Sequence, residues 1–193
     1  MNYKTYTYND YQAITRETSG CDDLSVLALG LVGESIEFID AVDQIYSSTN
    51  VNCLVEIIEE VVKEAGDVFW YAARIMDVMN EPFQLWQIHS ASTTDNFNNS
   101  CRKSFRKKFR VVRNAGVVSE HVKKVTGHGH DLNKELVCKY IGDIVRDIAH
   151  ILKGIYGQDA LAVCMHTNVE KLRKRYPNGF EVERSKNRRI DIV

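Results

Sequence analysis

Four acidic residues in the first half of the chain have the types and the spacing of a divalent-metal site. Glu34 and Glu37 lie three residues apart, and so do Glu64 and Asp67. Side chains three apart share one face of a helix, so each pair would present two carboxylates on the same side. Oxygen ligands without histidine or cysteine are those that Mg²⁺ and Mn²⁺ prefer. The pattern therefore predicts a magnesium site, with Mn²⁺ as a substitute ion.

The two acidic pairs can meet if their helices fold back on each other. Glu34 with Asp67, and Glu37 with Glu64, are both centred on position 50.5, beside the polar stretch 47–50. With equal rise per residue, the pairs would lie level across an antiparallel hairpin, roughly 20 Å from its turn. Such a cluster needs a neutralising cation, because like charges repel in a low dielectric. A solvated acidic face is the alternative.

Two glycines accompany the acidic pairs. Gly33 and Gly66 lie within stretches that otherwise favour helix. A glycine in the middle of a helix costs about 1 kcal/mol relative to alanine. We therefore expect either close packing or the close approach of a ligand at both positions.

The elements that must position these residues are helices throughout. Apolar residues recur every three or four positions, which is helical periodicity. Helices are expected at 24–45, 54–76, about 101–125, about 131–154 and about 158–176. A short helix before Gly20 would be capped by Asn9 or Asp10, and Asp22 or Asp23 would cap the next one. No alternating strand pattern of useful length occurs, so the prediction is an all-α helical bundle built on antiparallel helical hairpins.

The predicted organisation is a single all-α domain over 1–193. Within it we expect a metal-binding hairpin at 22–80, a second hairpin at 101–155, and a closing helix with a phosphate-binding tail at 158–180. Between the hairpins, 83–89 reads as a short amphipathic piece and 93–100 as a linker, because the latter is polar and rich in turn residues. The tail from Phe180 is expected to be irregular.

Composition excludes several classes of protein. The chain is 44% apolar and 26% charged, which is typical of a globular protein and not of collagen-like or disordered chains. No stretch of about 18 uncharged apolar residues occurs, so no membrane partner is expected. The five cysteines are scattered without zinc-type spacing, and the first residues lack the apolar segment of a secretory leader. We therefore expect reduced thiols in a cytoplasmic protein.

The net charge of −1 hides an asymmetry between the two halves. Residues 1–94 carry four basic and fifteen acidic side chains, whereas residues 95–193 carry 21 basic and 11 acidic ones. An acidic half suits divalent cations and a basic half suits phosphates. Mutual attraction of the two halves is the alternative interpretation.

Two stretches that carry the acidic pairs resemble a known enzyme family. GLVGESIE at 30–37 and EAGDVFWY at 64–71 are similar to the paired acidic motif of the MazG-like nucleotide pyrophosphohydrolases. These belong to the all-α nucleoside triphosphate pyrophosphatase superfamily, which also holds the dimeric dUTPases. The stretch 10–18 is similar to the family's N-terminal helix, and NVEKLRKRYPNGF at 168–180 to its closing segment.

The resemblance implies a four-helix arrangement and cleavage of a nucleotide between its α and β phosphates, which gives a nucleoside monophosphate and pyrophosphate. The Mg²⁺ ligands would be Glu34, Glu37, Glu64 and Asp67. Magnesium there would polarise the phosphates and lower the pKa of a bound water, and one carboxylate, not yet assigned, would act as general base. The substrate-binding candidates lie in the closing segment: Asn168, Lys171, Arg175 and Tyr176. The base, the sugar, a diphosphate or alarmone substrate, and formation of a homodimer all stay open.

Lys171 and Arg175 lie one helical turn apart and could clamp phosphates, with Asn168 on the same face. A solvated helix end is the alternative for this pair. Trp70, Phe38 and Tyr71 could stack on a base, although aromatic residues at helical spacing are more often part of a core.

The chain departs from the family by an inserted hairpin between the acidic motif and the closing segment. We interpret it as a degenerate tandem copy, because GDIV at 142–145 parallels GDVF at 66–69. A mirror about position 128.5 gives the positions that would correspond to the metal ligands: Asn114, Val117, Tyr140 and Asp143. With one carboxylate of four, this copy would hold no cation and would supply basic walls to the site.

Other classes of function fit fewer residues. A non-catalytic nucleic-acid-binding or interaction protein could use the basic helix 102–113, but this would leave the carboxylates without a role, so nucleic acid is not the expected partner. A His-Asp phosphohydrolase would need to recruit His121, His130, Asp131 and Asp143 or Asp147. The Glu-x-x-His motif of di-iron bundles and the P-loop motif do not occur.

Overall fold

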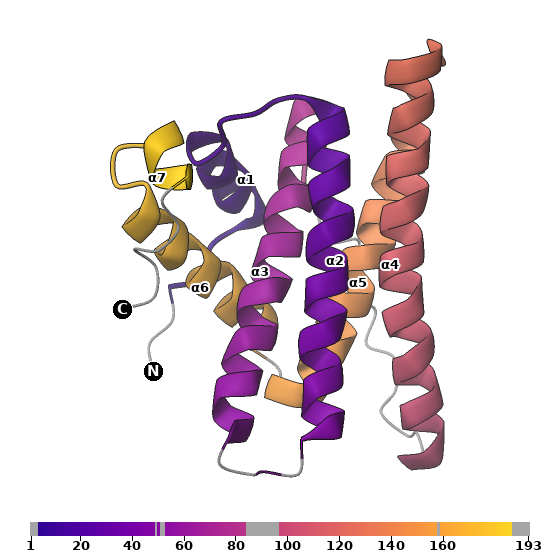
Figure 1. Cartoon of the computed structure of the whole chain (residues 1–193), viewed down its shortest axis with the longest axis vertical. Coiled ribbons are helices and arrows are strands. Elements are labelled where there is room, and N and C mark those ends of the chain that lie inside the picture. The colour runs from indigo at the N-terminus through magenta and orange to yellow at the C-terminus, as the bar shows by residue number, and fades with distance from the viewer. Residues whose placement is uncertain (1–3, 49, 51–52, 84–96, 158, 187–193) are drawn as a thin grey trace.

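The computed structural model describes residues 4–48, 50, 53–83, 97–157 and 159–186, with the backbone alone at 97–105. This part of the chain is all-α, as predicted, and forms seven helices (Figure 1). They are α1 (Tyr8–Glu17), α2 (Leu24–Ser47), α3 (Leu54–Val78), α4 (Phe97–His128), α5 (Lys134–Tyr156), α6 (Ala160–Arg175) and α7 (Val182–Lys186).

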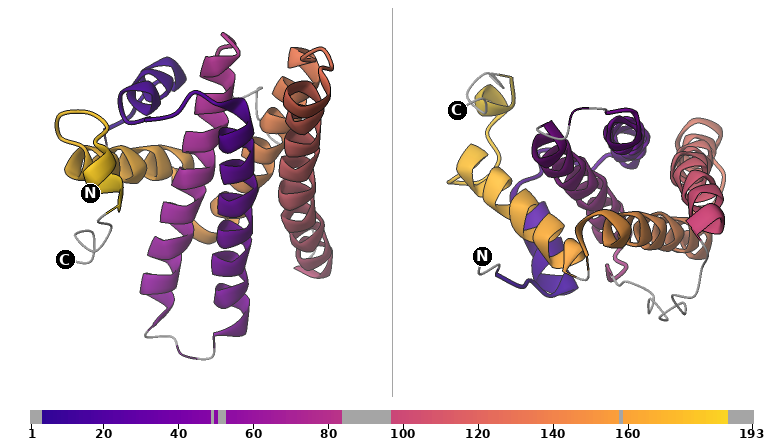
Figure 2. Two further views of the ribbon diagram at one scale, coloured as in Figure 1. Left: turned by 45° about the horizontal axis from the view of Figure 1, so that its top comes forward. Right: turned by 90° about the horizontal axis from the view of Figure 1, so that it is seen from below.

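The four long helices form a bundle of two hairpins. α2 packs against α3 and α4 packs against α5, while α2 also contacts α4 and α3 contacts α5. The shorter helices α1 and α6 pack on α3 and lie on the side of the hairpin away from α4 (Figure 2). The expected helical pairs are therefore present. The origin of the α4–α5 pair as a degenerate copy of the first stays a prediction.

Capping residues explain where the first two helices begin. Asp23 caps α2, because its carboxylate accepts hydrogen bonds from the backbone N–H groups of Ser25 and Val26. The predicted cap of α1 is wrong, since Thr7 takes that place. Thr7 Oγ1 accepts from the Asp10 backbone N–H at 3.1 Å, and Asp10 Oδ2 accepts in return from that of Thr7 at 3.2 Å. In this reciprocal capping box, Asp10 lies inside the first turn and binds the backbone N–H of the capping residue Thr7, so it cannot itself be the cap.

Two expectations for irregular structure are corrected. α4 begins at Phe97, so the last four residues of the predicted linker are helical, while 84–96 lie outside the described residues. Once a helix is nucleated, each further residue adds a hydrogen bond, which favours extension into a polar stretch. The tail forms the short helix α7, and ion pairs between Glu181 and Arg184 and between Glu183 and Lys186 bridge its turns.

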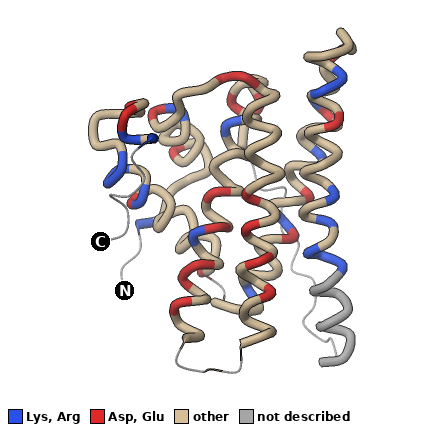
Figure 3. Tube along the Cα trace, viewed as in Figure 1, with Lys and Arg blue, Asp and Glu red and all other residues tan. Residues whose placement is uncertain are grey.

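Charge is segregated between the two hairpins. Acidic side chains concentrate on α2 and α3, whereas basic ones concentrate on α4 and at the end of α6 (Figure 3). Among the described helices, none combines the length and the apolar character needed to cross a bilayer. The cysteines with described side chains, Cys21, Cys53, Cys138 and Cys164, form no disulfide with one another. Cys101 lies outside that set.

The glycines beside the acidic pairs have different surroundings. A Cβ at Gly66 would lie 2.8 Å from the Cβ of Asn168, so close packing between α3 and α6 requires glycine there. A Cβ at Gly33 would meet nothing within 4 Å. The expectation of close packing is therefore confirmed for Gly66 and wrong for Gly33, where approach of a ligand remains the prediction.

Alanine substitutions should separate these two glycines. Gly33→Ala should raise the free energy of unfolding by about 0.5–1 kcal/mol, because alanine favours helix and has open space at this position. Gly66→Ala should lower it, because Asn168 would have to move. Urea denaturation of both variants measures the difference. Loss of stability in Gly33→Ala would contradict the open surroundings of Gly33.

Candidate functional site

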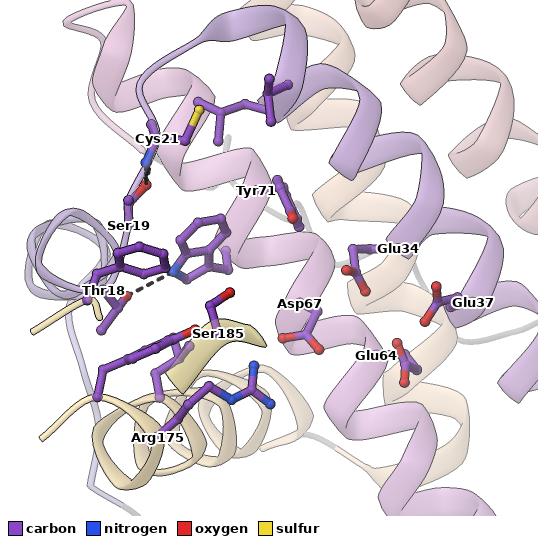
Figure 4. A pocket seen from close by; sticks show the side chains of 17 residues that line it. Thr18, Ser19, Cys21, Glu34, Glu37, Glu64, Asp67, Tyr71, Arg175 and Ser185 are labelled. Carbon is purple, nitrogen blue, oxygen red and sulfur yellow. Dashed lines mark hydrogen bonds between the residues drawn. The ribbon is translucent and has the colours of Figure 1, made fainter. Parts of the chain in front are cut away.

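A cavity of about 310 Å³ opens between the α2–α3 hairpin and the elements that cover its outer side (Figure 4). Its wall is formed by residues 18–21, by parts of α2, α3, α6 and α7, and by Tyr176 and Phe180. None of the described lining residues belongs to α4 or α5. The expectation that the second hairpin supplies basic walls is therefore wrong, because α4 packs on α2 along a different face.

Three of the predicted carboxylates meet at one end of this cavity. Glu34 and Glu37 project from α2, and Glu64 projects from α3 (Figure 4). Each offers one oxygen atom, and these atoms lie within 4.8 Å of one another. The level register of the hairpin thus brings these residues together, and we refer to them as the carboxylate cluster.

Asp67 lines the same cavity but binds residues of α6. Its Oδ1 accepts a hydrogen bond from Lys171 Nζ at 2.5 Å and another from Asn168 Nδ2 at 2.9 Å, and Lys171 also contacts Oδ2. Asp67 is not among the residues whose oxygens gather within 4.8 Å. The fourth predicted ligand is thus held by an ammonium group at the edge of the carboxylate cluster.

Asn168 is connected to the site by its hydrogen bond to Asp67. Its side chain is 1% exposed and packs against Gly66. Tyr11 OH donates to Asn168 Oδ1 at 2.8 Å and lies 3.1 Å from the carbonyl oxygen of Gly66. Tyr11 is a residue to which sequence reasoning gave no role in the site. No local pattern points to it, because its partners lie 55 and 157 residues away.

The surroundings of Glu64 strongly perturb the pKa of its carboxyl group. Burial, and then the negative charge of Asp67, raise its pKa to about 8, with further contributions from Glu60 and Glu34. Its Oε2 atom is buried and has no hydrogen-bond partner. A buried oxygen without a donor, in a group of mutually repelling carboxylates, fits a hard divalent cation with oxygen ligands.

This perturbation predicts how stability changes with pH in metal-free protein. The pKa of Glu64 is about 8 in the folded chain against a reference value of 4.5, so the folded state binds more protons between these values. The free energy of unfolding should therefore fall as pH rises through that window, and Glu64→Gln should flatten the fall. Melting temperatures of both proteins between pH 5 and pH 9, with a chelator present, measure the effect. Parallel curves would contradict it.

Aromatic rings form part of the cavity wall. Trp70, Tyr71, Tyr176 and Phe180 line it, and Trp70 Nε1 donates to Thr18 Oγ1 at 3.0 Å, which fixes the indole (Figure 4). The Trp70 and Tyr71 rings lie 4.9 Å apart edge to face, and those of Tyr176 and Phe180 lie 5.2 Å apart. The cavity wall therefore offers aromatic surface to a ligand.

The remaining residues divide between cavity and core. Arg175 and Ser185 line the cavity from α6 and α7, whereas Lys171 and Asn168 are not among the lining residues. The phosphate clamp of Lys171 and Arg175 stays a prediction. Tyr176 is 8% exposed and is one of the residues that line the cavity. Phe38 is fully buried, so it belongs to the core and cannot stack on a ligand.

Two of the described basic side chains of α4 form ion pairs with neighbouring helices. Lys108 pairs with Asp43 of α2, and Arg110 pairs with Asp147 of α5, whose side chain is fully buried. Arg102 and Lys103 lie outside the described side chains. These pairs attach α4 to the bundle, which is the structural alternative to nucleic-acid binding.

Residues required by a His-Asp phosphohydrolase are engaged elsewhere. His121 Nε2 accepts from the backbone N–H of Asn133, next to the start of α5. Asp143 binds Arg146, and Asp147 binds Arg110. Among the described residues, only the carboxylate cluster brings three potential metal ligands of the types His, Cys, Asp or Glu close together.

No protein-family model, curated protein or solved structure matches this chain. The resemblance to MazG-like enzymes therefore rests on the motif residues alone.

Proposed function

We propose that this protein is a Mg²⁺-dependent nucleoside triphosphate pyrophosphohydrolase, which hydrolyses its substrate to a nucleoside monophosphate and pyrophosphate. The observation that carries the proposal is the composition of one cavity. It has three clustered carboxylates at one end, and a cationic side chain and aromatic rings on its wall. These features suit the metal, the phosphates and the base of a nucleotide respectively.

Glu34, Glu37 and Glu64 are the residues that would hold Mg²⁺. When bound, the ion supplies polarisation of the phosphate oxygens and a lowered pKa for a coordinated water. A carboxylate of the site accepts the proton that the attacking water loses. The water oxygen joins the α phosphorus, the bond from that phosphorus to the oxygen bridging to the β phosphorus breaks, and pyrophosphate leaves.

The outer wall of the cavity would bind the rest of the substrate. Arg175 neutralises phosphate oxygens from the wall, and Lys171, one turn earlier on α6, does so from its place beside Asp67. The base stacks on the aromatic part of the wall, where the hydrogen bond from Trp70 to Thr18 keeps the indole oriented. Asn168 is buried and orients Asp67 through the hydrogen bond from its Nδ2 atom.

The test is pyrophosphate release from a panel of canonical and modified nucleoside triphosphates, diphosphates and alarmones. Wild type with Mg²⁺ should release pyrophosphate and a monophosphate from at least one triphosphate, and a chelator should stop the reaction. Glu37→Gln, assayed beside wild type, should be inactive. Folded wild-type protein that is silent across the panel would contradict the proposal and favour a binding role for α4.

A further inference from the structure

Lys171 and Asp67 form an ion pair that leaves Asp67 outside the carboxylate cluster. Lys171 Nζ contacts both oxygens of Asp67, and Asn168 Nδ2 donates to one of them. Asp67 follows Glu64 by three residues on α3 and lines the same cavity, yet its oxygens lie outside the 4.8 Å group. A carboxylate bound in this way cannot use the same lone pairs for a cation.

The helix that carries Lys171 is anchored by buried contacts, whereas the lysine side chain itself is partly exposed. Asn168, one turn earlier on α6, is fixed by contact with Gly66 and by the hydrogen bond from Tyr11. Lys171 is 24% exposed at its side chain, and Asp67 is 26% exposed. A lysine ammonium on a flexible stem can exchange one anionic partner for another without movement of the helix.

We propose that Lys171 is a positioning residue that withholds Asp67 from the metal-ligand set and releases it when a phosphate chain binds the ammonium group. The inference rests on the proposed function for the identity of the two ligands, a divalent cation and a polyphosphate. It implies that phosphate binding strengthens cation binding, and that cation binding strengthens phosphate binding by the same factor.

Metal binding without nucleotide tests the role of Lys171. Isothermal titration calorimetry with Mn²⁺ would compare wild type, Lys171→Met, Asp67→Asn and the double variant. Lys171→Met should tighten Mn²⁺ binding about tenfold, the size expected for release of one charge-assisted hydrogen bond. Asp67→Asn should weaken binding about tenfold more in the Lys171→Met background than in wild type, because Asp67 becomes a ligand only there. The cycle cancels long-range charge effects that are the same in both backgrounds.

Two variants of α6 serve as controls. Arg173→Met removes a cation from the same helix whose described partners are Glu170 and Tyr6, so it should leave Mn²⁺ affinity within about twofold of wild type. Lys171→Arg should restore the wild-type affinity, because a guanidinium group can pair with Asp67. Melting curves establish that each variant is folded.

Equal Mn²⁺ affinity in Lys171→Met and wild type would overturn the proposal, and so would a cycle without coupling between Lys171 and Asp67. Absence of Mn²⁺ binding in every variant would overturn both this role and the metal site. A coupled cycle in a protein that hydrolyses no nucleotide would leave the role of Lys171 standing and refute the pyrophosphohydrolase activity alone.

Discussion

Glu37→Gln should lower kcat/KM for magnesium-dependent pyrophosphate release at least about 100-fold, which exceeds the usual effect of replacing an outer-shell partner of a metal site. Glutamine keeps the shape of the side chain but removes the charge that attracts the cation. Because Glu37 is exposed on α2, the fold should be unaffected. Initial rates over a range of Mg²⁺ concentrations, with melting curves of both proteins, provide the measurement.

Glu59→Gln is the matched control for this loss. Glu59 is an exposed glutamate on α3, in the same hairpin, and it belongs neither to the carboxylate cluster nor to the cavity lining. It changes the net charge by the same amount, so it should retain activity within about twofold, as a screened surface charge would. Equal activity of wild type and Glu37→Gln would remove Glu37 from the metal site. Equal losses in both variants would show that the acidic surface acts only through its general charge.

The carboxylate cluster was predictable because it depends on helical geometry alone. The two helices rise equally per residue from a shared turn, and this places Glu37 opposite Glu64. The packing of the other helices has little influence on that register. Binding of Asp67 by Lys171 could not be predicted in this way. It depends on how α6 lies across α3, and this is set by contacts such as Asn168 against Gly66.

The role of the second hairpin shows a similar limit. Periodicity predicted its helices, and their charge indicated a basic wall for the site. The structure instead pairs Lys108 with Asp43 and Arg110 with buried Asp147, so these cations hold α4 against its neighbours. A charge run in a sequence does not reveal its partners until the packing of the helices is known.

Arg74→Ala should cost about 3 kcal/mol or more of the free energy of unfolding. Arg74 lies on α3 and is 1% exposed, and its guanidinium group binds Asp77 on the same helix and Asp22 before α2. Asp77 also binds Arg16 of α1, and the hydrogen bond from Arg16 is the main cause of its lowered pKa. Removal of Arg74 leaves a largely buried carboxylate with fewer donors and creates a cavity.

Two further variants separate charge from volume in this network. Arg16→Ala removes a side chain that is 65% exposed, so it should cost less than about 1 kcal/mol. Arg74→Met keeps much of the volume and should fall between the two alanine variants. Urea denaturation, fitted with one common dependence of the free energy of unfolding on urea concentration, would measure the stability of all three variants. A loss in Arg74→Ala no larger than that in Arg16→Ala would show that the buried guanidinium is not what holds these segments together.

The same network should affect substrate binding, because it fixes a wall of the cavity. Asp22 directly follows the segment 18–21, which lines the cavity, and its attachment to Arg74 anchors that segment to α3. The carboxylate cluster lies on other turns of α2 and α3 and does not depend on this contact. At temperatures where it remains folded, Arg74→Ala should therefore raise KM for the nucleotide more than it lowers kcat. A fall in kcat at unchanged KM would instead place the damage at the carboxylates.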